Sequence, residues 1–101
     1  MKNVKTPTTD SYQEYLIASL QDHEEAATYI EAILEAENPE HQLLISALKD
    51  IIDAQLQSNN ISEQVQIKWE QLHQMLLKSG GAEIYTFVAL LDALGFKLEV
   101  R

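Results

Sequence analysis

The side chains that could bind a metal ion are few and unfavourably spaced. His23 opens the run His-Glu-Glu-Ala-Ala, which begins like a zinc-protease motif but lacks the second histidine four residues later. Glu70 and His73 match half of a di-iron bundle motif, in which two such pairs and two further glutamates must converge. The chain has no cysteine, which excludes disulfides, thiolate zinc sites and cysteine nucleophiles. The sequence therefore predicts neither a metal site nor a cofactor.

The glycines do not form a nucleotide-binding or hydrolase motif. Of the three glycines, two lie in one expected turn and the third at an expected helix end. The sixteen acidic residues make chance carboxylate pairs unavoidable, and a carboxylate-rich helix face is usually only solvated. We therefore expect a protein that is not an enzyme.

One set of polar side chains has the chemistry to contact DNA. It consists of Lys68, Gln71, Gln74 and Lys78, in a stretch that is expected to be helical. Glutamine can pair with adenine edges, and lysine with guanine or phosphate, in the major groove. The same residue types also fill ordinary solvated helix faces, so both interpretations stay open.

The charge distribution limits where a polyanion could bind. The 101 residues carry 7 basic and 16 acidic side chains, a net charge of -9, with three of the basic and eleven of the acidic residues in the segment 1–57. A surface that meets a nucleic acid must therefore lie in the C-terminal half, and its affinity should be low at physiological salt. The acidic N-terminal half suits a basic protein partner instead.

Size and hydropathy indicate one small folded domain. Apolar residues make up 46% of the chain, enough for a core. No apolar stretch approaches the roughly 18 residues of a membrane span, and the first ten residues lack the apolar segment of a signal peptide. We expect a soluble, cytoplasmic protein with a flexible lead over 1–9 and a single helical domain over 10–101.

Helical periodicity and capping residues predict five helices. Asp10 or Ser11 can cap the first, and Asp22 has capping-box spacing for the second. The pair Asn38-Pro39 is typical of a helix start and predicts the third helix, which ends near Ser58.

The segment 61–78 has two interpretations. The side chains that lie in one narrow arc of an unbroken helix are Ile61, Val65, Trp69, Leu72 and Leu76. Ile67 lies far from that arc and would be better buried if the helix broke near Gln66. Because no glycine or proline enforces a break, both interpretations stay open.

The last helix is expected from Ala82 to Leu94, between Gly80-Gly81 and Gly95. Its predicted buried residues are Ile84, Phe87, Val88, Leu91 and Leu94. Residues 96–100 alternate apolar and polar types, which predicts a short strand. A single strand needs a partner, so we expect a homodimer that pairs Phe96, Leu98 and Val100 with the same tail of a second subunit across a two-fold axis.

Several segments resemble the HigA-like addiction-module antidote (antitoxin) family of helix-turn-helix transcriptional regulators. The matching stretches, in order, are residues 15–16, 22–30, 32–40, 43–44, 47–51 and 90–100. The resemblance implies an all-α, five-helix domain of helix-turn-helix (lambda-repressor-like) type with a short C-terminal β-strand. It also implies a dimeric bacterial regulator that binds its own operator DNA, represses its operon and neutralises a RelE/HigB-like toxin protein.

The sequence departs from the family pattern where DNA would be read. Family members carry a turn glycine and a recognition helix of the type Leu-Ser-Arg-x-Ser-Leu-Tyr, whereas here the glycine is missing and Lys68-Trp69 replaces the Ser-Arg pair. This departure supports a second hypothesis, a degenerate helix-turn-helix domain that acts only as a protein–protein interaction module. A helix that is continuous from Ile61 to Lys78 would favour the second hypothesis.

Overall fold

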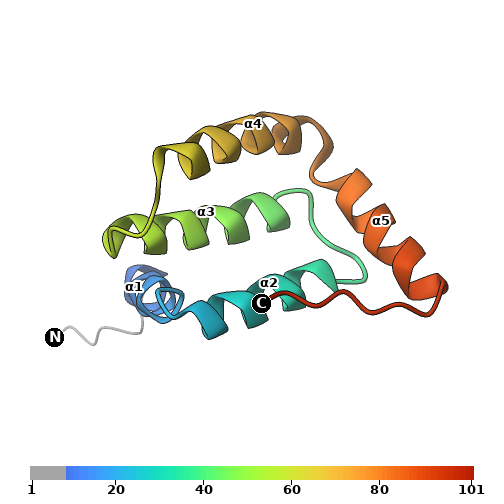
Figure 1. The fold of residues 1–101 in the computed structure, drawn as a ribbon, viewed down its shortest axis with the longest axis horizontal. Coiled ribbons are helices and arrows are strands. Elements are labelled where there is room, and N and C mark those ends of the chain that lie inside the picture. The colour runs from blue at the N-terminus through green and yellow to red at the C-terminus, as the bar shows by residue number, and fades with distance from the viewer. Residues whose placement is uncertain (1–8) are drawn as a thin grey trace, which may run out of the picture.

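The computed structural model describes residues 9–101 and is all-helical over that range (Figure 1). Its helices are α1 (Thr9–Ser19), α2 (His23–Leu34), α3 (Leu43–Gln57), α4 (Glu63–Ser79) and α5 (Ala82–Ala93). Helices α2, α3 and α4 run in alternating directions (Figure 1). Helix α1 lies beside one end of α2 and α3, and α5 slants across the opposite end of the layer (Figure 1). The all-α class and the five helices are thus as predicted.

The predicted lead over 1–9 lies almost entirely outside the part of the chain that the structure describes. Residues 1–8 of the predicted 1–9 lead lie outside the described part of the chain, and Thr9 is already the first residue of α1. None of the described helices combines the length and the apolar character that a membrane span requires.

The predicted cap of α2 is confirmed, but the predicted start of α3 is wrong. The Asp22 carboxylate accepts a hydrogen bond from the backbone N–H of Glu25 at 3.0 Å. Helix α3 begins at Leu43 rather than at Asn38-Pro39, and Gln42 caps it without a side-chain hydrogen bond. The segment 35–42 forms a connection in which the chain reverses direction, so that α3 can pack along α2 (Figure 1).

Helix α4 is one unbroken helix of 17 residues, with no break at Gln66 or Ile67. Its cap is Ser62, whose hydroxyl oxygen accepts the N–H of Val65 at 3.2 Å. Ile67 remains 52% exposed. Because neither glycine nor proline interrupts the segment, continuous backbone hydrogen bonding prevails over the burial of one isoleucine.

The core consists of two apolar clusters that share α3. One cluster contains Ile17, Leu20, Ala26 and Ala54, where α1 and α2 meet α3. The other contains Leu44, Ile45 and Leu76, where α3 meets α4, and Leu76 is 1% exposed. The central position of α3 explains why this helix carries buried residues along most of its length.

Helix α5 is supported on one narrow side only. It has no fully buried residue, and Ile84, Val88 and Leu91 are half-buried. Phe87 and Leu94 were predicted to be buried, and this prediction is wrong because both side chains are exposed. The end of the three-helix layer offers α5 too little surface to cover its whole apolar stripe (Figure 1).

Helix α5 ends in a Schellman motif, which directs the chain after it. Gly95 has φ of 89°, a left-handed conformation that glycine adopts without a side-chain clash. The N–H of Phe96 bonds to the carbonyl of Leu91 at 2.8 Å, and the N–H of Gly95 to that of Asp92 at 3.0 Å. This pair of hydrogen bonds confirms the predicted position of Gly95 after the end of the helix. It also fixes the backbone of Phe96 beside the last turn of α5.

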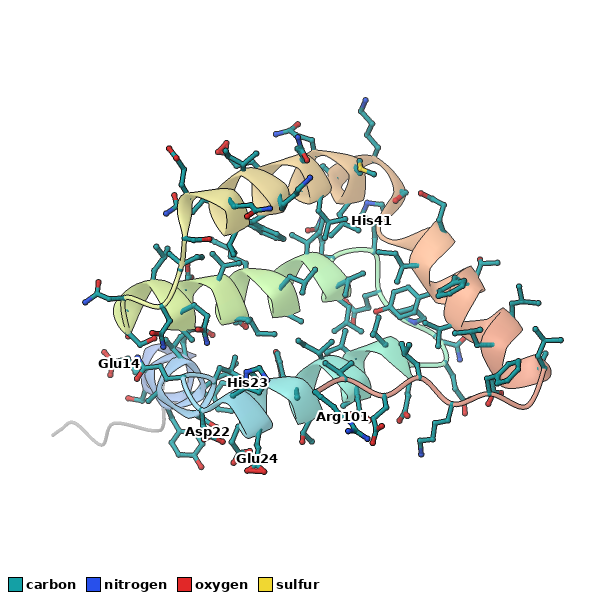
Figure 2. The ribbon with its side chains drawn as sticks, in the orientation of Figure 1. Glu14, Asp22, His23, Glu24, His41 and Arg101 are labelled. Carbon is teal, nitrogen blue, oxygen red and sulfur yellow. The ribbon has the colours of Figure 1, made fainter. Side chains whose placement is uncertain are left out.

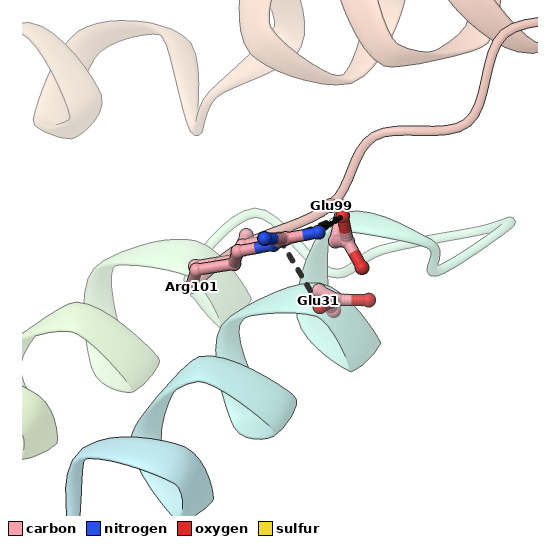
Figure 3. Close-up of polar contacts among 4 residues, drawn as sticks. Glu31, Glu99 and Arg101 are labelled. Carbon is pink, nitrogen blue, oxygen red and sulfur yellow. Dashed lines mark hydrogen bonds and ion pairs between the residues drawn. The ribbon is translucent and has the colours of Figure 1, made fainter.

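The predicted C-terminal strand is not present. Residues 96–101 run back along α2 as an extended segment, and residues 9–101 contain no strand with which it could pair (Figure 1). Its neighbour is a helix, whose backbone donors and acceptors are already used, so a strand ladder cannot form. The N–H of Val100 instead donates to Oε2 of Glu31 at 3.1 Å, while Arg101 pairs with Glu99 (Figure 3).

Candidate interaction surfaces

The four predicted DNA-contacting residues are all on α4, but they do not share one side of it. Lys68, Gln71, Gln74 and Lys78 are all exposed. Helical spacing places Gln71, Gln74 and Lys78 on the side of α4 that faces away from α3, whereas Lys68 lies on the flank of the helix, near Leu72. Glu63, Glu70 and Ile67 are exposed on the outer side, with Gln71, Gln74 and Lys78. The face is therefore polar and mixed in charge rather than basic.

The packing of α4 differs from a two-helix DNA-reading unit. In that motif two helices meet at about 90–120° through a turn of about 3–4 residues. Here α3 and α4 lie antiparallel, joined by residues 58–62 (Figure 1). The inner side of α4, which includes Leu72 and Leu76, packs against α3, so the whole helix forms one layer of the domain.

His73, which belongs to the partial di-iron motif with Glu70, packs against Trp69 on α4. Their rings are stacked, with centroids 4.8 Å apart and planes 6° from parallel, and both side chains are half-buried. Within residues 9–101 no group of three or more potential metal-ligating side chains comes together. His73 therefore has a packing partner in Trp69, and Glu70 occupies an exposed position beside it.

A cavity of about 640 Å³ lies between the C-terminal end of α2, helix α5 and the extended tail. We call it the tail groove. Its acidic lining residues are Glu31, Glu35, Glu37 and Asp92, and Lys97 is the basic one. Its apolar lining includes Leu34, Pro39, Val88, Phe96 and Leu98. The groove thus combines apolar walls with a marked excess of negative charge.

Tyr85 lines the tail groove, but its polar atom is not exposed to the groove. Its hydroxyl oxygen is buried and makes no hydrogen bond with the described residues. Burial raises the pKa of Tyr85, because the charged phenolate loses solvation. The hydroxyl is therefore neutral at physiological pH and can donate or accept a hydrogen bond.

Sequence reasoning missed the tail groove. Glu31 on α2 and Glu35 at its C-cap are four residues apart, which is the one local sign that their carboxylates lie on the same side of the helix. Asp92 comes from α5, far along the chain, and only the packing of α5 beside the end of α2 brings it to them.

The second unusual surface is an apolar stripe on α5. It consists of Phe87, Leu90, Leu94 and Phe96, whose side chains are 54%, 54%, 61% and 63% exposed. We call it the α5 stripe. Exposed apolar patches of this kind mark interaction sites more often than isolated exposed residues do.

The three predicted dimer residues have different surroundings. Phe96 is exposed on the α5 stripe, whereas Leu98 and Val100 are half-buried along α2. The tail of one chain is thus partly covered by its own α2, and pairing of two tails stays a prediction.

Comparison with known proteins gives no relative: no protein-family model matches the chain, and neither a curated protein nor a solved structure is significantly similar to it.

Proposed function

We propose that this chain is a helical protein-interaction module of the antitoxin type, which holds a basic, partly apolar segment of another protein in the tail groove. The resemblance of the sequence to HigA-like antitoxins suggests that this partner is a RelE/HigB-like toxin. Partner binding then rests on the groove and not on a DNA-reading helix.

The observation that carries the proposal is the composition of the tail groove. Four carboxylates and one ammonium group line a cavity with apolar walls, in a chain whose net charge is -9. Such a field attracts basic groups and repels acidic ones, and it increases the rate of association with a basic protein. The apolar walls of the groove provide apolar contact area for a partner, which charged side chains alone do not provide.

The continuity of α4 supports the same proposal. A helix-turn-helix regulator of the resembled family needs a bend before its recognition helix, and α4 is unbroken across Gln66 and Ile67. A continuous helix in this segment favours a module that only binds proteins.

A DNA-binding regulator remains the second candidate, and the exposure of Lys68, Gln71, Gln74 and Lys78 favours it. Specific binders commonly neutralise about six to ten phosphates. The C-terminal half of one chain offers four basic residues, so a dimer would reach that number only if nearly all of them took part. Glu63 and Glu70 on the same face oppose phosphate contact.

Calorimetric titration with the product of the adjacent gene tests the groove. Glu35→Lys and Asp92→Lys reverse exposed charges in the groove, and we expect each to weaken binding at least tenfold. The matched control is Glu14→Lys, the same change at an exposed position on α1, away from α5 (Figure 2). Equal affinities for all three variants would contradict the proposal.

A gel-shift assay separates the two candidate functions. With the DNA upstream of the gene, at about 50 mM salt where electrostatic binding is strong, we expect no shift beyond that of random DNA of equal length. A sequence-specific shift that is lost in Lys68→Glu would instead establish the DNA-binding regulator.

A further inference from the structure

We propose that the extended tail, residues 96–101, is an internal competitor of the partner. The tail groove then recognises an extended segment in which apolar and basic residues alternate, and binding of this segment displaces residues 97–101 from α2. The inference rests on the proposed function, because it specifies the partner segment and the regulation of the same groove. Its consequence is that the free chain limits its own affinity for the partner.

The tail itself has the chemistry that the groove attracts. Its sequence, Phe-Lys-Leu-Glu-Val-Arg, has an apolar residue at every second position, and most of the residues between them are basic. Lys97 and Leu98 both line the groove. Among the described residues of this lining, Lys97 supplies the one ammonium group beside four carboxylates. A basic group that enters the groove therefore meets repulsion from Lys97 as well as attraction from the carboxylates.

A neutral backbone donor and two half-buried side chains hold the tail on α2. The N–H of Val100 donates to Oε2 of Glu31 at 3.1 Å (Figure 3). The side chains of Leu98 and Val100 are half-buried, so each still offers part of its apolar area to water. Few interactions must therefore break when the tail leaves.

The charged groups of the tail do not tie it to the helices. Arg101 forms its ion pair with Glu99, which belongs to the tail itself, at 2.9 Å (Figure 3). Within residues 9–101, no ion pair joins Lys97 to a carboxylate, and its side chain is exposed. The tail thus leaves the carboxylates of the groove open to stronger pairing with a partner.

A basic partner segment can replace the tail at Glu31. The carboxylate of Glu31 accepts from a neutral amide in the single chain. A lysine or arginine side chain would form a charge-assisted hydrogen bond with it, which is shorter and stronger. Because Glu31 is half-buried, water and salt screen such a pair less than at an exposed position. Apolar residues of the partner would cover the side of α2 that Leu98 and Val100 leave.

The end of α5 provides a fixed point about which the tail can swing. The Schellman hydrogen bonds run from the N–H of Phe96 to the carbonyl of Leu91 and from the N–H of Gly95 to the carbonyl of Asp92. They hold the chain as far as the amide of Phe96. Displacement of residues 97–101 therefore requires no change in α5.

A synthetic peptide tests the inference without the natural partner. Its sequence is that of residues 96–101 with lysine in place of Glu99 and with both ends blocked, so that every polar position is basic. Titration of the full chain from about 0.05 to about 5 mM peptide covers the weak affinity of so short a segment. By nuclear magnetic resonance, we expect shifts at Glu35, Val88 and Asp92, and a several-fold faster hydrogen exchange of the Val100 amide.

Two tail variants separate a competing tail from a fixed wall. Lys97→Gln removes the ammonium group, and Leu98→Asn weakens the contact of the tail with α2 without adding a charge. We expect each to tighten peptide binding at least threefold, because each weakens the internal competitor. Lys68→Gln, the same change as at Lys97 but at an exposed position on α4, is the matched control and should leave the affinity unchanged. Circular dichroism shows whether each variant keeps its helices.

Three outcomes would overturn the inference. They are a peptide that shifts no groove resonance, binding that leaves the exchange of the Val100 amide unchanged, and binding that is weaker in Leu98→Asn. The last two would show that the tail is a fixed wall of the site. The proposed function has its own test with the product of the adjacent gene. There, Glu35→Lys and Asp92→Lys should weaken binding whether or not the tail moves, so the two failures are distinguishable.

Discussion

Val100 and Glu31 are 69 residues apart in the chain and are joined by a hydrogen bond, from the backbone N–H of Val100 to Oε2 of Glu31 at 3.1 Å (Figure 3). This bond holds the extended tail along α2. It also gives the Val100 amide an acceptor that a neighbouring strand would otherwise supply. The tail in turn forms one wall of the tail groove through Phe96, Lys97 and Leu98.

Removal of this acceptor should release the tail while the helices remain folded. We expect Glu31→Ala to increase the hydrogen-exchange rate of the Val100 amide several-fold, because the amide then has only water to bond. Glu31→Gln keeps a side-chain oxygen that can accept and should have a smaller effect. Exchange measured by nuclear magnetic resonance checks both variants, and identical rates in Glu31→Ala and the unmodified chain would contradict the role of this bond.

The connection between α4 and α5 should tolerate a side chain poorly at Gly80. This residue has φ of 66°, and a Cβ atom there would lie 2.5 Å from Nδ1 and 2.9 Å from the carbonyl oxygen of His41. His41 lies beside this connection (Figure 2). A left-handed conformation costs a non-glycine residue roughly 1–2 kcal/mol, and displacement of His41 adds roughly 1–3 kcal/mol.

The matched control is Gly95→Ala, because Gly95 has φ of 89° but no atom within 4 Å of the point that a Cβ atom would occupy. We expect Gly95→Ala to lower the free energy of unfolding by roughly 1–2 kcal/mol, which is the cost of the left-handed backbone conformation alone. Urea unfolding monitored by circular dichroism measures both variants. If Gly80→Ala costs no more than Gly95→Ala, the close approach of His41 is not a constraint.

The N-cap of α2 should contribute measurably to stability. The Asp22 carboxylate satisfies the N–H of Glu25, and its negative charge lies at the positive end of the helix dipole. We expect Asp22→Ala to lower the free energy of unfolding by about 1 kcal/mol. Asp22→Asn retains the acceptor and should recover most of the loss in the same urea experiment. A loss of equal size in both variants would assign the effect to charge rather than to the hydrogen bond.

Stability should fall at alkaline pH because of Tyr29. Burial, then the negative charge of Asp50 and then Tyr12 raise the pKa of Tyr29 above its ordinary value of 10.0. A raised pKa means that the folded chain holds the phenolic proton more tightly than the unfolded chain does. The resulting stabilisation is fully present below pH 10.0 and is lost as the pH rises through the higher folded-state pKa.

Thermal unfolding from about pH 9 to about pH 11 covers the range in which an ordinary tyrosine titrates. Tyr29→Phe removes the titrating group, so its melting temperature should fall less over this range than that of the unmodified chain. Tyr15→Phe, at an exposed position on α1, is the control and should retain the original pH dependence. Parallel curves for Tyr29→Phe and the unmodified chain would exclude Tyr29 as the source.

The sequence by itself determined the number of helices and several of their ends, because these depend on neighbours within one turn. Asp22 caps α2 three residues ahead of its partner, and Gly80 and Gly95 end α4 and α5 through their own backbone angles. The sequence also shows that residues 63–79 contain no glycine or proline. Periodicity alone did not decide whether this segment is one continuous helix or breaks near Gln66.

The tertiary structure alone decided which apolar faces are covered. Periodicity showed that Phe87 and Leu94 share one side of α5. Whether that side is buried depends on the surface that lies opposite it. The end of the layer formed by α2, α3 and α4 is too small to cover it. The alternating pattern of the tail likewise left its neighbour unspecified, and that neighbour is a helix. The tail groove exists because folding brings Asp92 next to Glu31 and Glu35, a proximity that no local spacing encodes.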